Sequence, residues 1–367
     1  MTTLFTPVKV GPYTLSHRVA LAPLTRMRSE AGDVPGNLMA EYYAQRASEG
    51  GLLIAEATPV SVRGNGYLGA PGIYADTQIA GWKRVANAVH AKGARIFLQL
   101  YHSGRQSHSD LQPGGAAPLA PSAIAFDGRA HTKDGWQSAT PPRAMTLEDI
   151  EIAIDEFRAA AVRAQTAGFD GVEIHGANGY LVDQFLQDGS NRRTDAYGGS
   201  RENRARFLLD VTAAAASVFG GERVGVRIAP GGTFGGMADS DPAATFAHAA
   251  RELNGFGLAW LHVIEPRVAG GQEVAEGAHA VAARALRAHF HGPIVAAGGF
   301  TPETAAAIVE AGDADLVAFG RHFIANPDLP HRIRHGLALN AYDRSTFYGG
   351  DHRGYTDYPA VPETVAS

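Results

Sequence analysis

The sequence has 367 residues, a length that suits two average domains or one α/β barrel. Hydrophobic residues make up 45% and charged residues 19% of the chain, which is ordinary for a globular protein and excludes disordered and fibrous classes. The absence of cysteine excludes disulfides, thiolate-bound metals, iron–sulfur clusters and a cysteine nucleophile, and a net charge of −5 offers no basic field for nucleic acid.

The first segment, Met1 to Arg18, lacks the apolar core of a signal peptide, and no apolar run approaches the about 18 residues of a membrane span. We therefore expect a cytoplasmic protein without a membrane segment. Glycine is the unusual residue, at 44 of 367 positions, which indicates many sites that need bare backbone.

The first predicted element is a hairpin over Val8–Leu15, which we expect to cover the floor of the fold. Eight short apolar runs follow, without strict alternation, as is typical of strands buried on both faces of a parallel sheet. These predicted strands are Arg18–Leu24, Leu52–Ala57, Arg95–Tyr101, Gly171–His175, Val224–Ile228, Leu258–Ile264, Pro293–Ala297 and Leu316–Phe319. Helical spacing lies between them, over Leu38–Glu49, Gln78–Ala91, Arg201–Phe219, Pro242–Leu253 and Pro302–Ala311. Another predicted helix begins after Thr146, which can cap it together with Asp149.

Repeated alternation of strand and helix predicts a doubly wound sheet or a closed barrel, and eight strands are the number that closes a barrel. We therefore predict an α/β fold of the (β/α)8 TIM-barrel type, in which residues 1–367 form one domain. Ser103–Pro142 is an extended loop after the third strand, which we expect to shape a binding mouth. The tail after Leu339 is rich in aromatic residues and is expected to pack on the barrel.

In such a barrel the active site is built where the strands end. The residues at these ends include Pro23, Leu24, Thr25, Ala57, Thr58, Gln99, Tyr101, His175, Arg227, Glu265, Gly298, Gly299, Gly320 and Arg321. The last four precede helices after strands seven and eight, where barrels of this type bind phosphate. Glycines let backbone N–H groups approach phosphate oxygens, and a guanidinium adds a charged fork. We predict a phosphate site there; the alternative is that the glycines serve only as tight turns.

His175, Asn178 and Tyr180 follow the fourth predicted strand within six residues. A lone histidine would more often be a packing residue. With an amide and a phenol beside it, the pattern favours a polar clamp on a carbonyl or nitro oxygen together with a phenolic proton donor.

Arg227 ends a buried strand, where its charge is costly unless it faces an anion. The alternative to an anionic ligand is a salt bridge to Glu173 or Glu265. These two glutamates are also the only weak candidates for the carboxylate pair of a glycosidase.

Two motifs fail on their context. Gly64–Gly69 spells the dinucleotide fingerprint G-x-G-x-x-G, but Pro71 follows at once and no helix is predicted to open on the last glycine. His331 and His335 are spaced as a metal pair on a predicted helix, yet no third ligand accompanies them, so we predict no metal site.

Several segments together carry a resemblance to a known family. They are Leu21–Arg26, His175–Phe185, Asn191–Gly199, Phe319–Arg321, Asn326–Pro327, Phe347–Gly350 and Gly354–Pro359. On these segments the chain resembles the Old Yellow Enzyme family of FMN-dependent ene-reductases along essentially its whole length. Within that family it looks most similar to the bacterial N-ethylmaleimide, pentaerythritol tetranitrate and glycerol trinitrate reductases. The resemblance implies FMN across the barrel mouth, NADPH or NADH as the hydride donor, and an α,β-unsaturated carbonyl, maleimide or nitro compound as substrate.

The resemblance also implies roles for individual residues. The implied cofactor-binding residues are Pro23, Leu24, Thr25, Ala57, Gln99, Arg227, Gly298, Gly299, Gly320, Arg321 and Tyr348. Thr25 would donate a hydrogen bond to the flavin C4 carbonyl and so raise the flavin potential. Gln99 would pair with the pyrimidine edge, and Arg227 would face the negative charge that develops near N1 on reduction.

For the substrate, the resemblance implies that His175 and Asn178 hold the electron-withdrawing oxygen. Tyr180 would protonate the α-carbon while hydride passes from flavin N5 to the β-carbon. Tyr67 and Tyr101 would line the substrate pocket. Because the chain has no cysteine, it is excluded from the iron–sulfur branch and from the branch with a cysteine beside the flavin.

Two other functions are compatible with a phosphate-binding barrel. One is a flavin-free sugar-phosphate aldolase or isomerase, and the other is a catalytically silent binding module. A Schiff-base aldolase needs a lysine at a strand end, and none of the predicted ends supplies one. The sequence gives no indication of the oligomeric state.

Overall fold

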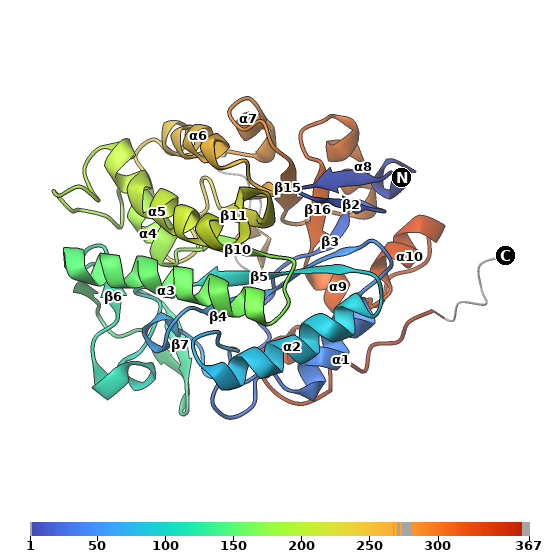
Figure 1. Ribbon diagram of the computed structural model, residues 1–367, viewed down its shortest axis with the longest axis horizontal. Helices are drawn as coiled ribbons and strands as arrows, with labels where there is room; N and C mark the ends of the chain where they lie inside the picture. Colours follow the sequence, from blue (N-terminus) through green and yellow to red (C-terminus); the bar gives the residue numbers. More distant parts are fainter. Residues whose placement is uncertain (1, 267, 270–271, 274–280, 362–367) are drawn as a thin grey trace.

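Eight parallel strands close into a barrel in the computed structural model, which describes residues 2–266, 268–269, 272–273 and 281–361 (Figure 1). Each strand pairs with the next barrel strand along the chain, and the last pairs with the first. They are β3 (Val19–Leu21), β4 (Leu52–Pro59), β5 (Arg95–Tyr101), β10 (Gly171–Gly176), β11 (Val224–Ile228), β12 (Trp260–Ile264), β15 (Ile294–Ala297) and β16 (Leu316–Phe319). The predicted (β/α)8 barrel is confirmed, and every predicted strand overlaps one of these. β4 runs two residues and β10 one residue past the predicted end.

Helices surround the barrel, and α2, α3 and α5 pack side by side along it (Figure 1). The α-helices are α1 (Asn37–Arg46), α2 (Asp76–His90), α3 (Leu147–Thr166), α4 (Leu181–Leu186), α5 (Arg201–Phe219), α6 (Pro242–Leu253), α7 (Ala283–Arg287), α8 (Pro302–Glu310), α9 (Arg321–Ala325) and α10 (Leu329–His335). The cap predicted for α3 is present, since Thr146 Oγ1 accepts from the Asp149 N–H at 3.1 Å and the Asp149 carboxylate accepts from the Thr146 N–H at 2.8 Å. The predicted helix over Leu38–Glu49 ends three residues early, because the backbone at Ala47 is already extended.

Short elements complete the chain. The minor strands are β1 (Val8–Val10), β2 (Tyr13–Leu15), β6 (Leu119–Ala120), β7 (Arg129–Thr132), β8 (Gly135–Ser138), β9 (Arg143–Ala144), β13 (Val268–Ala269) and β14 (Gln272–Glu273). The 3-10 helices are η1 (Thr2–Phe5), η2 (Val62–Gly64), η3 (Ser109–Leu111), η4 (Pro113–Gly115), η5 (Gly221–Arg223), η6 (Asn254–Phe256) and η7 (Arg344–Thr346).

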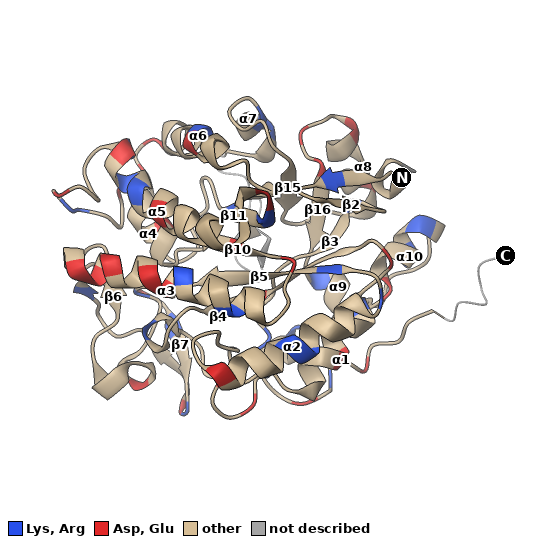
Figure 2. Cartoon of the chain, in the orientation of Figure 1, with Lys and Arg blue, Asp and Glu red and all other residues tan. Residues whose placement is uncertain are grey.

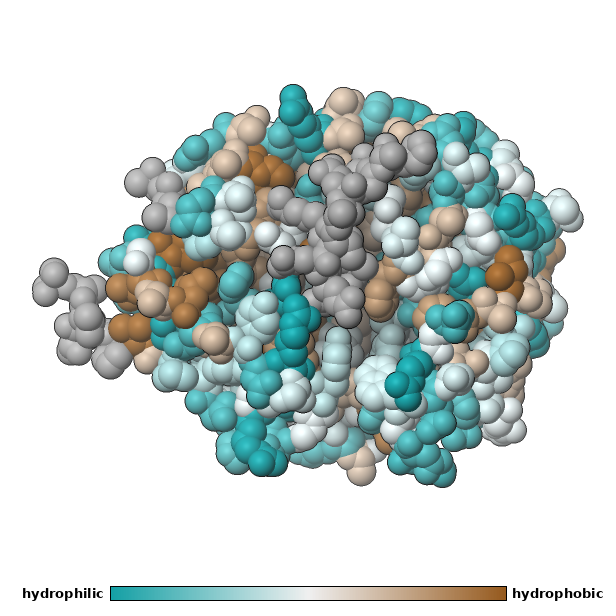
Figure 3. Space-filling view, turned by 180° about the vertical axis from the view of Figure 1, so that it is seen from behind, coloured by the Kyte–Doolittle hydropathy of each residue, from teal (hydrophilic) through white to brown (hydrophobic). Residues whose placement is uncertain are grey.

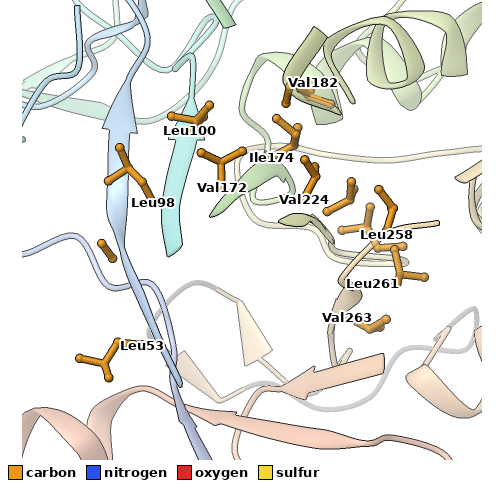
Figure 4. Close-up of a cluster of buried hydrophobic side chains, with 14 of the residues drawn as sticks. Leu53, Leu98, Leu100, Val172, Ile174, Val182, Val224, Leu258, Leu261 and Val263 are labelled. Atoms are coloured by element: carbon orange, nitrogen blue, oxygen red, sulfur yellow. The ribbon is translucent and has the colours of Figure 1, made fainter. Parts of the chain in front are cut away.

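The core has two layers. The outer layer lies between strands and helices and consists mainly of aliphatic side chains, several of which are labelled in Figure 4. The inner layer fills the barrel and includes Phe97 and Trp260, whose ring centroids are 4.5 Å apart. Val10 and Leu15 of the β1–β2 hairpin belong to this inner layer, so the predicted floor hairpin is confirmed.

The tail packs on the barrel, as its aromatic content predicted. The buried side chain of Arg26 holds it there. Arg26 donates from Nε to the Phe347 carbonyl at 2.9 Å and from Nη2 to the Gly354 carbonyl at 2.8 Å. Its guanidinium lies over the rings of Tyr42 and Tyr355, which stack on each other at 4.1 Å between centroids. The tail therefore approaches the segment that carries Thr25 at the barrel mouth.

Charges of both signs are mixed on the outer helices, as on α3 and α5 (Figure 2). The face in Figure 3 is mostly hydrophilic, with small separate apolar groups. None of the helices in the described part of the chain is long and apolar enough to cross a bilayer.

Glu56 lies fully buried beside this anchored tail and should make stability depend on pH. The Arg26 N–H donates to Glu56 Oε2 at 3.1 Å and the Tyr43 hydroxyl donates to Oε1 at 3.2 Å, but burial dominates and raises the pKa of Glu56 from 4.5 to about 7. Between these values the folded protein holds a proton that the unfolded chain has released, so stability falls as pH rises through this window.

We expect the unfolding free energy of Glu56→Gln to rise relative to that of the wild type by on the order of 3 kcal/mol between pH 4.5 and pH 8. Denaturation midpoints of both proteins across this range measure the difference. Glu41→Gln, at an exposed carboxylate on α1, is the control. A difference between wild type and Glu56→Gln that stays constant with pH would contradict the raised pKa.

Candidate active site

Two adjoining cavities lie at the carboxyl ends of the barrel strands. The larger, of about 590 Å³, is lined by the predicted residues Pro23, Leu24, Thr25, Ala57, Tyr67, Gln99, His175, Asn178, Tyr180, Arg227, Arg321 and Tyr348. The smaller, of about 180 Å³, is lined by Gly298, Gly299 and Gly320 and shares Leu24, Asn178, Arg227 and Arg321 with the larger one. Residues that the sequence placed at separate strand ends thus converge on one continuous site.

Three residues that the sequence placed at strand ends line neither cavity: Thr58, Glu265 and Tyr101. Tyr101 is the one among them that was expected to line the substrate pocket. Its ring centroid lies 5.1 Å from that of Tyr180 and 6.4 Å from that of His175, and the residue is only 1% exposed. The prediction that Tyr101 lines the substrate pocket is therefore corrected: its buried ring packs against the rings of Tyr180 and His175.

Three glycines expose bare backbone to the smaller cavity. Gly298 has a φ of +114°, and a Cβ there would come within 2.9 Å of the Val268 side chain. At Gly320 a Cβ would come within 3.1 Å of Leu24. Gly298 and Gly299 lead into α8, whose cap is Thr301, and Gly320 leads into α9. Backbone N–H groups at such loops, together with the Arg321 guanidinium, suit a phosphate group.

Arg227 faces the site with an unused donor. Its Nε has no hydrogen-bond partner among the described residues, although the residue is only 9% exposed. Burial lowers the pKa of Arg227, and the nearby Glu173 carboxylate opposes this shift, so the guanidinium stays charged at neutral pH. An anionic or electron-rich group in the cavity would satisfy the free N–H.

The alternative interpretation paired Arg227 with Glu173 or Glu265, and the Glu173 carboxylate is bound by other side chains. It accepts hydrogen bonds from Gln99 Nε2 at 2.8 Å, Trp260 Nε1 at 2.7 Å and His262 Nδ1 at 2.9 Å. The barrel register creates this cluster, since Glu173 is paired with Gln99 across β10 and β5. The bond from Nε2 to Glu173 orients the Gln99 amide, whose carbonyl oxygen can accept from a ligand N–H.

The turn that carries the polar clamp has a strained backbone. Asn178 and Gly179 follow one another with φ of 57° and 70°, in the left-handed region. Three buried side chains hold this turn: the Asp183 carboxylate accepts from the Gly179 N–H at 2.9 Å, Gln184 donates to the Gly179 carbonyl at 2.7 Å, and Gln106 donates to the Asn178 carbonyl at 2.7 Å. Sequence reasoning missed these three, although two of them stand one helical turn after the predicted clamp.

His175 is a neutral imidazole in this environment. Burial lowers its pKa well below the ordinary value of 6.5, and the positive charge of Arg227 adds to the effect. His175 Nδ1 has no hydrogen-bond partner in the described part of the chain. Arg227 and His175 are paired across β11 and β10, which brings a charged donor and a neutral imidazole to the same wall.

Tyr180 presents a protonated phenol to the cavity. Burial raises its pKa well above 10, so the phenol keeps its proton at neutral pH and can release it only to a strongly basic acceptor. The Tyr180 hydroxyl lies 2.9 Å from the hydroxyl of Tyr67, and its ring is edge-on to His175 at 4.9 Å between centroids.

The outer wall of the cavity is aromatic. Trp136 of the β7–β8 hairpin lies 6.0 Å from Tyr348 of the tail and 6.0 Å from Tyr67, measured between ring centroids. Phe126 and Phe234 also line the cavity. The predicted mouth loop and the predicted tail thus meet above the clamp, but the sequence did not single out Trp136, Phe126 or Phe234.

Gly64–Gly69 lacks the following helix that a dinucleotide site needs, although Tyr67 within it lines the larger cavity. Gly64 ends the short helix η2, and no helix opens on Gly69. His331 and His335 lie on α10 with ring centroids 4.5 Å apart. Across the described ranges, no group of three potential metal ligands is found.

Comparisons with known proteins agree with this geometry. The family model described as NADH:flavin oxidoreductase / NADH oxidase matches residues 3–340. 12-oxophytodienoate reductase 1 of Oryza sativa subsp. japonica is 48% identical over 98% of this chain and 93% of its own length. Flavin oxidoreductase hxnT of Emericella nidulans is 45% identical over 97% of both chains. The solved structure of morphinone reductase superimposes with a TM-score of 0.92 at 48% identity, over 99% of this chain and 98% of that one. A complex of morphinone reductase with tetrahydroNAD has a TM-score of 0.91.

Proposed function

Because this chain belongs to the NADH:flavin oxidoreductase / NADH oxidase family, within the Old Yellow Enzyme family, we propose that its two cavities bind FMN and an activated alkene. As a member of this family the chain is a flavin-dependent oxidoreductase and an ene-reductase. FMN, when bound, supplies the two-electron chemistry that links a reduced nicotinamide to the alkene. The alternative of a flavin-free aldolase or isomerase is not favoured.

The residues present fit FMN. The glycine loops and Arg321 around the smaller cavity suit its phosphate. In the larger cavity, the free Nε of Arg227 and the carbonyl oxygen of Gln99 offer one donor and one acceptor to the polar edge of the ring. Ala57 adds only a methyl group to the lining, which leaves room for a flat ring beside Thr25.

His175 and Asn178 are assigned to the electron-withdrawing oxygen of the substrate, and Tyr180 to proton delivery at the α-carbon. The single observation that carries this assignment is that a phenol held fully protonated shares one cavity with a neutral imidazole whose Nδ1 has no partner among the described residues. A neutral donor polarises a carbonyl or nitro group without a charge to desolvate, and the phenol completes the addition of hydrogen.

For the substrate we assign α,β-unsaturated carbonyl compounds first, with maleimides and nitro compounds as further members of the class. Two relatives are named as reductases of 12-oxophytodienoate and of morphinone. The aromatic wall of Trp136, Tyr348 and Phe126 favours a broad apolar ring over a small polar substrate. NADH or NADPH serves as the reductant.

Spectroscopy of the purified protein tests the proposal. We expect it to carry FMN, to lose its yellow colour with NADH or NADPH under anaerobic conditions, and to regain it when an enone is added. Steady-state rates with both nicotinamides across enones, maleimides and nitro compounds then rank the substrates. A colourless protein that takes up no FMN on reconstitution would overturn the proposal.

A further inference from the structure

Two phenols, not one, stand at the point of proton delivery. The hydroxyl oxygens of Tyr67 and Tyr180 lie 2.9 Å apart, and both side chains line the larger cavity. Tyr67 comes from the segment after η2 and Tyr180 from the turn before α4, so the contact joins residues 113 positions apart. Tyr67 is the one hydrogen-bond partner of the Tyr180 hydroxyl within the described residues.

A hydroxyl group has a single proton, and this fixes the direction of the hydrogen bond during turnover. When Tyr180 points its proton at the α-carbon of a substrate, only Tyr67 can donate in the Tyr67–Tyr180 bond. As the proton leaves, negative charge develops on the Tyr180 oxygen, and a hydrogen bond to a charged acceptor is stronger than one to a neutral acceptor. The bond therefore strengthens in the transition state, which is the condition for accelerating the step.

From this geometry we infer that Tyr67 is a positioning residue for proton delivery, which directs the Tyr180 proton into the cavity and stabilises the Tyr180 oxygen as the proton leaves. This inference rests on the proposed role of Tyr180. The α-carbon gains the proton, the Tyr180 oxygen keeps the electron pair of its O–H bond, and a solvent proton restores the phenol after the product has left. Tyr67 remains protonated throughout.

The surroundings of Tyr67 suit this role. Burial raises the pKa of Tyr67 to about 12, so Tyr67 is a neutral donor across the physiological range. The Tyr67 N–H donates to Asn65 Oδ1 at 3.0 Å, and its ring is edge-on to Trp136 and to Tyr180, which holds the hydroxyl in place. The ring of Tyr67 thus makes the packing contacts, and its hydroxyl is available to hydrogen-bond Tyr180.

A double-mutant cycle tests the inference. In the holoenzyme, Tyr67→Phe should slow reoxidation of the reduced enzyme by a saturating enone about 10- to 100-fold and leave flavin reduction by NADH or NADPH within about twofold. In the Tyr180→Phe background, the same change should have no further effect, because the group it acts on is gone. Multiplicative effects of the two changes would overturn the inference.

Two further readouts separate this role from a merely structural one. The solvent deuterium isotope effect on reoxidation should increase in Tyr67→Phe, because proton delivery becomes the slower event, and should not change between Tyr180→Phe and the double variant. Calorimetric affinity for a saturated product should stay the same. Tyr197→Phe is the matched control, since it removes a phenol hydrogen bond of 3.0 Å to Asp210 outside both cavities.

The outcomes distinguish the inference from the proposal beneath it. If Tyr180→Phe itself leaves reoxidation unchanged, the proposed function of Tyr180 fails. If Tyr180→Phe slows reoxidation while Tyr67→Phe does not, or if Tyr197→Phe slows it as much as Tyr67→Phe, the role assigned to Tyr67 fails alone.

Discussion

Tyr180→Phe should slow enone turnover by about 10²- to 10⁴-fold while the bound flavin is still reduced by NADH or NADPH at close to the wild-type rate. The change removes the proton that the α-carbon must receive and keeps the ring, whose edge-on contacts with His175 and Tyr67 preserve the cavity wall. Burial raises the pKa of Tyr180 well above 10, so the phenol stays protonated across the neutral range. The substitution therefore removes an acid that is available at every neutral pH.

Anaerobic stopped-flow absorbance measures the two halves of the cycle separately for Tyr180→Phe. Reduction by the nicotinamide is the internal control, because that half requires no proton from the phenol. If both halves slow equally, Tyr180 acts on the flavin site as a whole. A substrate whose carbanion is stabilised by a nitro group should tolerate the change better than an enone, since solvent can protonate it later.

The strands were predictable because strands buried on both faces of a barrel are continuous apolar runs, and closing the barrel gathers their ends at one mouth. That rule alone collects His175, Arg227 and Gly298 on the correct side of the fold. It gives no information on how neighbouring rings pack, which is why Tyr101 was assigned to the pocket, although it packs against Tyr180 and does not line the cavity. The α3 cap at Thr146 was readable because it is a contact between residues three positions apart.

The clamp's support was not predictable in the same way. Asp183, Gln184 and Gln106 act on backbone groups whose positions follow from two successive left-handed residues, and no local pattern requires Asn178 to adopt that conformation. The contact of Trp136 with Tyr348 depends on where a long loop and the tail come to rest. Such contacts arise from tertiary packing and have no periodic signal.

Arg321→Ala should weaken FMN binding about 100-fold, through loss of charge-assisted hydrogen bonds to the phosphate. Arg321 is the first residue of α9, lines both cavities, and has its guanidinium carbon 5.7 Å from the Tyr342 ring centroid. The FMN affinity of Arg321→Lys should lie between those of the wild type and Arg321→Ala, because an ammonium keeps the charge and loses the planar fork. Titration of the apoprotein with FMN, followed by quenching of flavin fluorescence, measures the dissociation constants.

Arg344→Ala is the matched control, since its guanidinium carbon lies 5.6 Å from the centroid of the same Tyr342 ring but the residue does not line the smaller cavity. Riboflavin, which lacks the phosphate, provides a second control in the ligand. Because Arg321 is assigned to the phosphate alone, its removal should leave riboflavin affinity within about twofold of wild type and so erase most of the preference for FMN. An equal loss of affinity for riboflavin and FMN would show that Arg321 contacts the flavin ring and not the phosphate. The glycine loops would then have to bind the phosphate without Arg321.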